Sequence, residues 1–267
     1  MRSIEQLQSL TGRRALVTGG AGHIGRAFCE TLAELGADVA VLDLDEAACA
    51  AVAEDLDKRF SVRTHPLGAD LADEERMRAA PAEVAEVLGG LDILVNCAAF
   101  VGTSGLTGWV TPFEEQSVDT WRAALEVNLT AAFALIQAAT PHLRASGRGS
   151  VVNIASTYAV VGPDMGLYEG TAMGNPAAYA ASKGGLVQLT RWLATVLAPD
   201  VRVNCISPGG VARGQDPDFV ARYEARTPMR RMGTEEDMKG ALAYLASDLS
   251  AYVTGQNLLV DGGWTVW

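Results

Sequence analysis

Tyr179 and Lys183 lie four residues apart in the stretch YAASK (179–183), which has the composition of a helix. On a helix, side chains at positions i and i+4 share one face. A tyrosine phenol has a pKa of about 10, and a nearby ammonium group favours its ionised form. The spacing therefore predicts a general acid or base, although such a pair is more often an ordinary pair on a helix surface. Tyr158 and Tyr168 have no lysine four residues later, so we expect them to be pocket or packing residues.

A glycine-rich loop is the second candidate for chemistry. The stretch TGGAGHIG (18–25) joins a strand-like run to a helical pattern and contains the spacing Gly20-x-Gly22-x-x-Gly25. Glycines at this spacing allow a tight turn and a close approach of the backbone to a pyrophosphate. The start of the following helix offers free N–H groups to the same phosphates. The loop therefore predicts a dinucleotide-binding site.

Asp43 ends the second strand-like run, 18 residues after Gly25. A carboxylate at this point can accept hydrogen bonds from the hydroxyls of the adenosine ribose, and it would repel a 2′-phosphate. We therefore expect NAD rather than NADP as the cofactor. A solvated carboxylate at a strand end is the alternative interpretation.

The composition excludes several classes of protein. The chain has 267 residues and a net charge of −11, which argues against a nucleic-acid partner because phosphate binding needs clustered Lys and Arg. Four cysteines form no CxxC pair and three histidines have no metal-ligand spacing, so we expect a cytoplasmic protein without a metal site. No window approaches ~18 uninterrupted apolar residues, so we expect no membrane span and no signal peptide.

Short apolar runs alternate with helical patterns along the whole chain. This alternation predicts parallel βαβ units, and hence a single α/β domain over 1–267, a doubly wound Rossmann-like fold with a parallel sheet of about seven strands flanked by helices. The expected strands lie within 14–20, 38–45, 62–73, 92–99, 150–156, 201–210 and 257–263. The longest expected helices span 117–145 and 177–198, and the irregular segments 100–118, 157–178 and 209–233 are predicted to be lids or to contain short helices.

Taken together, the motifs resemble the short-chain dehydrogenase/reductase family in its compact, single-domain branch. The resemblance covers nearly the whole chain. It comprises the glycine loop 18–25, Asp70-Leu71, NCAA (96–99), VNL (127–129), NIAS (153–156), YAASK, SPGG (207–210) and YVTGQNLLVDGG (252–263).

The resemblance implies a catalytic role for four residues. Tyr179 would act as the acid/base, Ser156 would hold the substrate oxygen, and Lys183 would lower the pKa of the tyrosine and bind the nicotinamide ribose. Asn128 would support a relay water near Lys183. The implied cofactor-binding residues are Gly19, Gly20, Gly22, His23, Ile24, Gly25, Asp43, Asp70, Leu71, Asn96, Ala98, Tyr179, Lys183, Pro208, Gly209 and Val211. Asn96 and Asn128 could instead satisfy buried backbone groups.

Three positions depart from the pattern of the compact branch. His23 replaces its middle glycine, so the literal glycine spacing resembles the longer sugar-nucleotide branch of the family. Ala99 replaces a glycine. Arg213 lies near the place of a threonine that follows Pro-Gly, which puts the usual contact to the cofactor carboxamide in doubt.

An insertion distinguishes this chain from its relatives. Ser156 and Tyr179 are 23 residues apart, whereas most relatives have about a dozen residues between them. We expect the insertion to border the substrate pocket, where its polar side chains could bind a polyhydroxylated substrate: Asp164, Tyr168, Glu169 and Asn175. A surface excursion or a subunit contact is the alternative. A weak similarity also points to bacterial relatives linked to surface-sugar synthesis.

The variable loop after the sixth expected strand contains three arginines, Arg213, Arg222 and Arg226. They could bind a phosphate or a carboxylate, or they could form a solvated helix face.

The sequence thus predicts an NAD-dependent oxidoreductase that interconverts a secondary alcohol and a ketone, with a sugar or sugar derivative as one candidate substrate. Its partner would be a small-molecule substrate, with no nucleic acid and no membrane. A non-catalytic dinucleotide-binding sensor and an NADP-dependent oxoacyl reductase are the alternatives. The family resemblance implies a homotetramer, or a homodimer, through the helices at 117–145 and 177–198.

Overall fold

The structure is a computed structural model that describes residues 1–101 and 104–267, so residues 102 and 103 of the predicted loop 100–118 lie outside the described residues. Within these described residues, seven strands form one parallel sheet, as predicted, and their order in the sheet is β3-β2-β1-β4-β5-β6-β7. They are β1 (Arg14–Thr18), β2 (Asp38–Asp43), β3 (Thr64–Gly68), β4 (Ile93–Asn96), β5 (Gly149–Ile154), β6 (Val201–Pro208) and β7 (Asn257–Val260). The strand order reverses between β1 and β4. Open α/β sheets bind ligands beyond the carboxyl ends of the strands at such a point.

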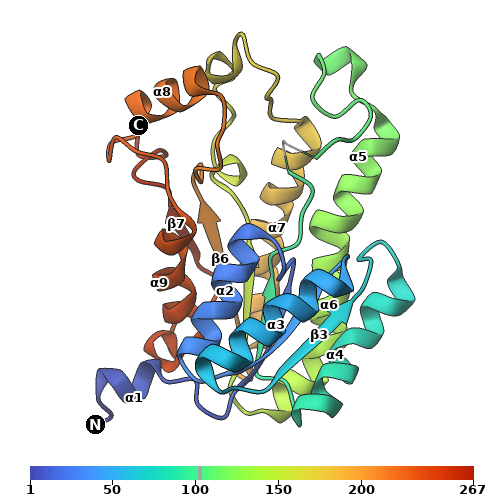
Figure 1. The fold of residues 1–267 in the computed structure, drawn as a ribbon, viewed down its shortest axis with the longest axis vertical. Helices are drawn as coiled ribbons and strands as arrows, with labels where there is room; N and C mark the ends of the chain where they lie inside the picture. The colour runs from blue at the N-terminus through green and yellow to red at the C-terminus, as the bar shows by residue number, and fades with distance from the viewer. Residues whose placement is uncertain (102–103) are drawn as a thin grey trace.

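Helices cover both faces of the sheet (Figure 1). One layer packs on the first face and consists of α2 (His23–Glu34), α3 (Glu46–Phe60) and α9 (Glu235–Ala246). The other layer consists of α4 (Glu74–Leu88), α6 (Ala131–Ala145) and α7 (Ala177–Leu197). Strands buried between two helix layers need apolar side chains on both faces, which explains their nearly continuous apolar sequences.

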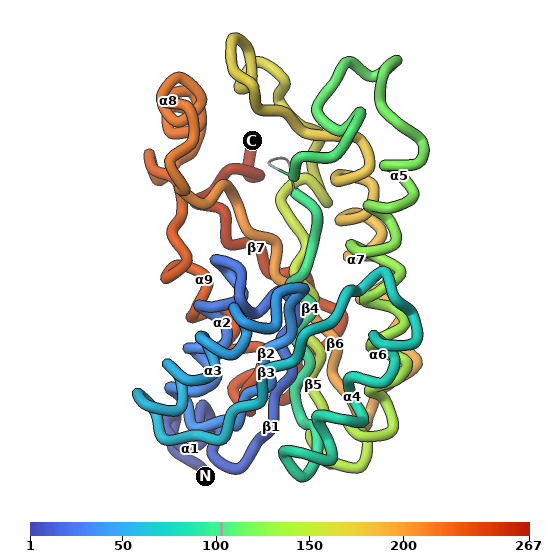
Figure 2. The backbone as a smooth tube through the Cα atoms, turned by 45° about the vertical axis from the view of Figure 1, so that its right-hand side comes forward, coloured from blue at the N-terminus to red at the C-terminus, as the bar shows by residue number. Residues whose placement is uncertain are grey.

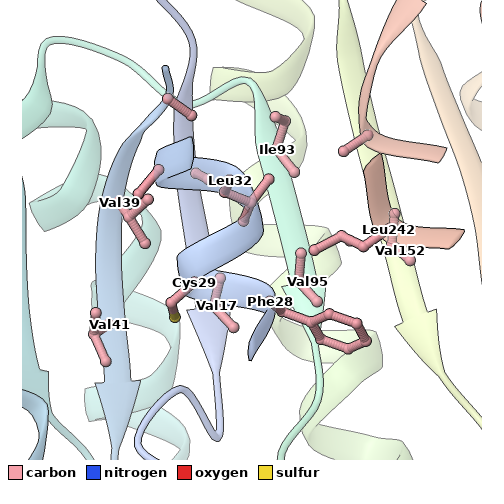
Figure 3. Packing of buried hydrophobic residues seen from close by; sticks show 14 of the residues in the cluster. Val17, Phe28, Cys29, Leu32, Val39, Val41, Ile93, Val95, Val152 and Leu242 are labelled. Carbon is pink, nitrogen blue, oxygen red and sulfur yellow. The ribbon is translucent and has the colours of Figure 1, made fainter. Parts of the chain in front are cut away.

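The packing of α2 on β1 shows how this core supports the glycine loop. Phe28 and Leu32 are fully buried against Val17 and Val39, and Figure 3 shows these side chains between the helix and the strands. Complete burial of one such side chain contributes about 1.5–3 kcal/mol. Strand and helix are therefore both held firmly, and the turn between them has little freedom.

The predicted long helix at 117–145 is confirmed, but it contains an irregular turn. Regular helix α5 (Val118–Leu125) runs into a π-helical turn, η2 (Glu126–Thr130), and then into α6. In that turn the Ala131 N–H donates to the Glu126 carbonyl, five residues back. Such π-turns are frequently found at functional sites, and Asn128 lies within this one.

By length and composition alone, the helix Val118–Ala145 is apolar enough to cross a membrane. In the structure its second half packs on the sheet and on α4. The buried side chains of that half include Leu135, Ile136 and Leu143. It is therefore a core helix of this domain.

Two of the predicted irregular segments do contain short helices beyond the carboxyl ends of the strands. Segment 157–178 forms η3 (Thr157–Ala159) and η4 (Met165–Tyr168), and segment 209–233 forms α8 (Pro217–Arg226). In Figures 1 and 2, α8 and the yellow insertion rise together above the sheet, and η4 contacts α8. In the third segment the structure forms the short helix η1 (Phe113–Glu115). The N-terminal helix α1 (Ile4–Gln8), which the sequence analysis did not predict, contacts η5 (Asp248–Ser250).

Candidate active site

A cleft of about 940 Å³ lies at the carboxyl ends of the strands and contains most of the predicted site residues. Of the predicted catalytic and cofactor-binding residues, Gly20, Asn96 and Asn128 do not line it. Those that line it are Gly19, Gly22, His23, Ile24, Gly25, Asp43, Asp70, Leu71, Ala98, Ser156, Tyr179, Lys183, Pro208, Gly209 and Val211. The cleft therefore joins the glycine loop to the predicted acid/base in one continuous space.

The glycine loop leaves no room for side chains at two positions. Gly19 has φ +65°, and a Cβ atom there would lie 2.8 Å from the backbone of Ala98. A Cβ atom on Gly25 would lie 1.9 Å from the Gly19 carbonyl oxygen. Helix α2 starts just after Gly22, which has no side chain to cap the first N–H groups. These groups remain free to bind phosphate oxygens, so the loop fits a dinucleotide pyrophosphate.

Asp43 is fixed at the end of β2 by the glycine loop itself. One carboxylate oxygen accepts the Ala21 N–H at 3.1 Å, and the other accepts the Leu44 N–H at 2.8 Å. The carboxylate still lines the cleft, and the next side chain, Leu44, is exposed and uncharged. This end of the cleft therefore fits ribose hydroxyls better than a phosphate.

Ser156, Tyr179 and Lys183 come together at the other end of the cleft. Ser156 follows β5 and caps η3, where its Oγ accepts the Tyr158 N–H at 3.2 Å. Tyr179 and Lys183 share one face of the first turns of α7. The Lys183 Nζ donates to the Ile154 carbonyl at 2.7 Å and lies 5.8 Å from the centre of the Tyr179 ring.

Burial sets the ionisation of both groups. Burial raises the pKa of the Tyr179 phenol, and a hydrogen bond with Ser156 opposes the rise. Burial lowers the pKa of Lys183 to about 8. Burial is the largest of the causes that shift the pKa of the phenol, so the expectation that the lysine brings this pKa below its ordinary value stays a prediction.

Asn128 and Asn96 lie behind the cleft and hold its walls. The Asn128 Oδ1 accepts the Phe100 N–H at 2.7 Å, and its Nδ2 donates to the Phe100 carbonyl and to the Ser182 Oγ, each at 3.1 Å. The Asn96 Nδ2 donates to the Asn153 Oδ1 at 2.8 Å. Asn128 thus satisfies backbone groups of Phe100, as the alternative interpretation expected, whereas Asn96 bonds another side chain and its buried Oδ1 has no partner among the described residues. Asn128 connects the loop after β4 to α7 through these bonds.

The insertion borders the cleft, but with only part of the expected side chains. Tyr168 and Asn175 line it, together with Tyr158 and Met173. Asp164 instead caps η4 and forms an ion pair with Arg226, and Glu169 does not line the cleft. The prediction that Asp164 and Glu169 face the substrate is therefore wrong for this structure.

The three arginines of the variable loop have other partners. Arg222 donates to the carbonyl oxygens of Leu167 and Glu169, at 3.2 and 2.6 Å, and Arg226 pairs with Asp164. Both therefore tie the insertion to α8. Arg213 does line the cleft, where its Nε lies 3.2 Å from a carboxylate oxygen of Glu235.

Helix α8 contributes two aromatic side chains that the sequence analysis missed. Phe219 and Tyr223 line the cleft, and the Tyr223 hydroxyl accepts the Gly210 N–H at 2.6 Å. Their spacing of four residues within a helical pattern was a usable signal, because it places both rings on one face.

The chain is similar to known proteins over nearly its whole length. Residues 19–265 match the family model described as enoyl-(acyl carrier protein) reductase. The chain is 34% identical over 265 residues to a probable galactose dehydrogenase of Rhizobium meliloti, covering 97% of each protein. It resembles the crystal structure of a short-chain type dehydrogenase/reductase from Mycobacterium marinum (TM-score 0.86, 30% identity, 99% of each chain covered). It also resembles a gluconate 5-dehydrogenase from Burkholderia cenocepacia in complex with NADP and tartrate (TM-score 0.87, 32% identity, 99% of this chain and 100% of that one).

Proposed function

The chain belongs to the short-chain dehydrogenase/reductase family, and we propose that it is an NAD-dependent member in which Tyr179 is the acid/base. It is an enzyme, an oxidoreductase that acts between alcohols and ketones. The proposal adds the cofactor NAD, the catalytic residues and a secondary alcohol or ketone of a sugar or sugar derivative as substrate. The similarity to a probable galactose dehydrogenase supports a carbohydrate as the substrate.

One observation carries the proposal: a single cleft has a carboxylate and a glycine loop at one end and a Ser-Tyr-Lys set at the other. Asp43, Gly22 and the start of α2 would hold the adenosine and pyrophosphate. When bound, the nicotinamide cofactor supplies or accepts the hydride. A purely nucleotide-sensing protein would not need Ser156, Tyr179 and Lys183 around one point of this cleft.

The residues of the chain then have separate tasks. Ser156 donates a hydrogen bond to the reacting oxygen and orients it, and the Tyr179 phenol gives a proton to that oxygen or takes one from it. Lys183 is held by the Ile154 carbonyl next to the phenol, where its charge stabilises the phenolate that forms. Asn128 acts indirectly, because it positions α7 against the loop after β4.

An acyl reductase is the second candidate, because the matching family model is described as an enoyl-(acyl carrier protein) reductase. An NADP-dependent enzyme of that kind would have to accommodate a 2′-phosphate beside Asp43 and the uncharged Leu44. We therefore favour the alcohol dehydrogenase. Assays with acyl thioesters and NADPH distinguish the two.

We also propose a cytoplasmic homotetramer or homodimer. The outer faces of α5, α6 and α7 carry exposed apolar side chains, including Trp121, Phe133 and Trp192. Contiguous exposed apolar surface commonly marks a protein interface. Light scattering after gel filtration measures the assembly, and a monomer at micromolar concentration would contradict this part of the proposal.

Replacement of the phenol tests the proposed function directly. Tyr179→Phe should lower turnover of any accepted alcohol by about 10²- to 10⁴-fold, while NADH binding, followed by fluorescence, stays within about 2-fold. Tyr252→Phe is the matched control, because Tyr252 is fully exposed. Retained activity in Tyr179→Phe would refute the assignment of the acid/base.

A further inference from the structure

Two tyrosine hydroxyls meet inside the cleft, at the end that holds Ser156 and Tyr179. The Tyr158 and Tyr168 oxygens are 2.9 Å apart, and both residues line the cleft. Tyr158 follows Ser156 by two residues, whereas Tyr168 is supplied by η4 of the insertion. Neither phenol takes part in the proton transfer of the proposed function.

We propose that the Tyr158–Tyr168 pair is a subsite for a second hydroxyl of the substrate, so that the enzyme acts on neutral compounds with a hydroxyl close to the reacting carbon. Polyols and their hydroxyketones have this chemistry. The inference rests on the proposed function, because it places the reacting oxygen at Ser156 and Tyr179.

Hydrogen-bond counting explains why the pair would select a hydroxyl. Whichever phenol donates to the other, one O–H group of the pair is left free to donate, and oxygen lone pairs remain to accept. A substrate hydroxyl can use both. An alcohol with hydrogen in that place would lose these hydrogen bonds, and sites built to bind a hydroxyl reject the deoxy analogue strongly.

The pair is close to the reacting centre. The backbone N–H of Tyr158 donates to the Oγ of Ser156, which fixes the backbone of Tyr158 beside the residue that would hold the reacting oxygen. The electrostatic influence of Tyr168 is also one of the causes that raise the pKa of Tyr179, and Tyr179 in turn raises that of Tyr158. Both phenols thus lie within electrostatic range of Tyr179, and all of these residues line the same cleft.

The insertion is held rigidly enough to present the pair. The Tyr168 ring packs against Phe219, with ring centres 5.3 Å apart, and Phe219 packs against Tyr223 at 5.9 Å. Tyr223 stacks on Trp264 at 4.4 Å, so the aromatic series links the insertion, α8 and the C-terminal segment.

Hydrogen bonds from α8 hold the insertion as well, because Arg222 donates to the Leu167 and Glu169 carbonyls. Preorganised groups lose little freedom when a ligand binds.

The charges around the pair favour a neutral substrate over a hydroxy acid. Among the described residues, the lysine and arginine side chains that line the cleft are Lys183 and Arg213. Lys183 donates to Ile154, and Arg213 is paired with Glu235. Asp216 adds negative charge to the lining. To pair with Lys183 or Arg213, a substrate carboxylate would have to displace the partner that each side chain already has.

Matched substrates test the subsite. For the wild-type enzyme with NAD, kcat/KM for cis-cyclohexane-1,2-diol should exceed that for cyclohexanol by at least about 10-fold. Tyr158→Phe and Tyr168→Phe should each remove most of this preference by lowering kcat/KM for the diol, with little change for cyclohexanol. Tyr252→Phe is the matched control, and NADH binding checks that each variant is folded. Galactitol should be oxidised more efficiently than galactonate.

The outcomes separate the subsite from the proposed function. Equal kcat/KM for the diol and cyclohexanol in the wild type, or a diol preference that survives in both variants, would overturn the subsite and leave the dehydrogenase intact. A preference for galactonate over galactitol would overturn the inference that the substrate is neutral. If the wild type binds NADH and oxidises none of these alcohols, the proposed function fails and the subsite fails with it.

Discussion

The Lys183 ammonium nitrogen lies 5.8 Å from the centre of the Tyr179 ring and is held by the Ile154 carbonyl at 2.7 Å. The side chain is only 3% exposed, and its burial lowers its pKa to about 8. The protein therefore keeps a costly cation next to the phenol. This arrangement suits catalysis better than stability.

Replacement of Lys183 should change the pH dependence of stability, because burial of its ammonium group is unfavourable. The unfolded chain binds the lysine proton up to about pH 10.4, whereas the folded protein releases it at about pH 8. Between these values the unfolded state binds more protons, so the lysine makes the wild type more stable as pH rises. The stability of Lys183→Met relative to the wild type should fall by about 2 kcal/mol between pH 7 and 9.5. Urea unfolding at both pH values measures the difference.

The wild type and Lys183→Met share their other ionisable groups. The contributions of those groups to stability therefore cancel when the two proteins are compared at the same pH. A difference between wild type and Lys183→Met that is constant from pH 7 to 9.5 would show that the lysine keeps an ordinary pKa. Lys58→Met is a suitable control because Lys58 lies on the exposed side of α3.

In the proposed function, the choice of cofactor should depend on Asp43. Repulsion between a carboxylate and a 2′-phosphate near the protein surface is worth about 1–4 kcal/mol at contact distances, so the wild type should bind NADH about 10- to 100-fold more tightly than NADPH. Asp43→Asn should reduce this ratio, mainly by improving NADPH binding, while one oxygen still accepts a backbone N–H. Fluorescence titration measures both affinities without a substrate.

Asp45→Asn is the matched control for that experiment. Asp45 is also a carboxylate after β2, but it caps α3 by accepting the Ala47 and Ala48 N–H groups, and asparagine caps a helix equally well. Its substitution should leave the cofactor preference unchanged. Equal affinities of the wild type for NADH and NADPH would remove Asp43 from the cofactor site.

The fold could be predicted from the sequence because its signals are local. The apolar strand runs, the helical spacing and the glycine loop each depend on neighbouring residues, and all seven strands form within or close to the predicted ranges. The π-turn at Glu126–Thr130 could not be predicted, because helical spacing does not reveal which carbonyl a given N–H selects.

The substrate end of the site was less predictable because its contacts are distant in sequence. Arg226 lies 62 residues from its partner Asp164, so no local pattern shows that this arginine is engaged. The same applies to Asp164, which looked free to meet a substrate. The pairing of Tyr158 with Tyr168 depends on how the insertion turns back toward Ser156, which its Gly- and Pro-rich sequence does not fix.

The Arg226–Asp164 ion pair should control substrate binding through the position of the insertion. Arg226 also lies over the Trp264 ring at 5.1 Å, so it joins the insertion to α8 and the C-terminal segment. The pair is partly exposed and should contribute only about 0.5–1 kcal/mol to stability. Asp164→Asn should therefore raise KM for the substrate several-fold without changing the Kd for NADH, and Arg226→Gln should raise it further because the ring contact is lost as well. Asp119→Asn, which breaks the exposed Arg122 pair on α5, is the matched control. If steady-state kinetics show the same KM in Asp164→Asn, Arg226→Gln and the wild type, the insertion is a surface excursion and does not form a wall of the substrate site.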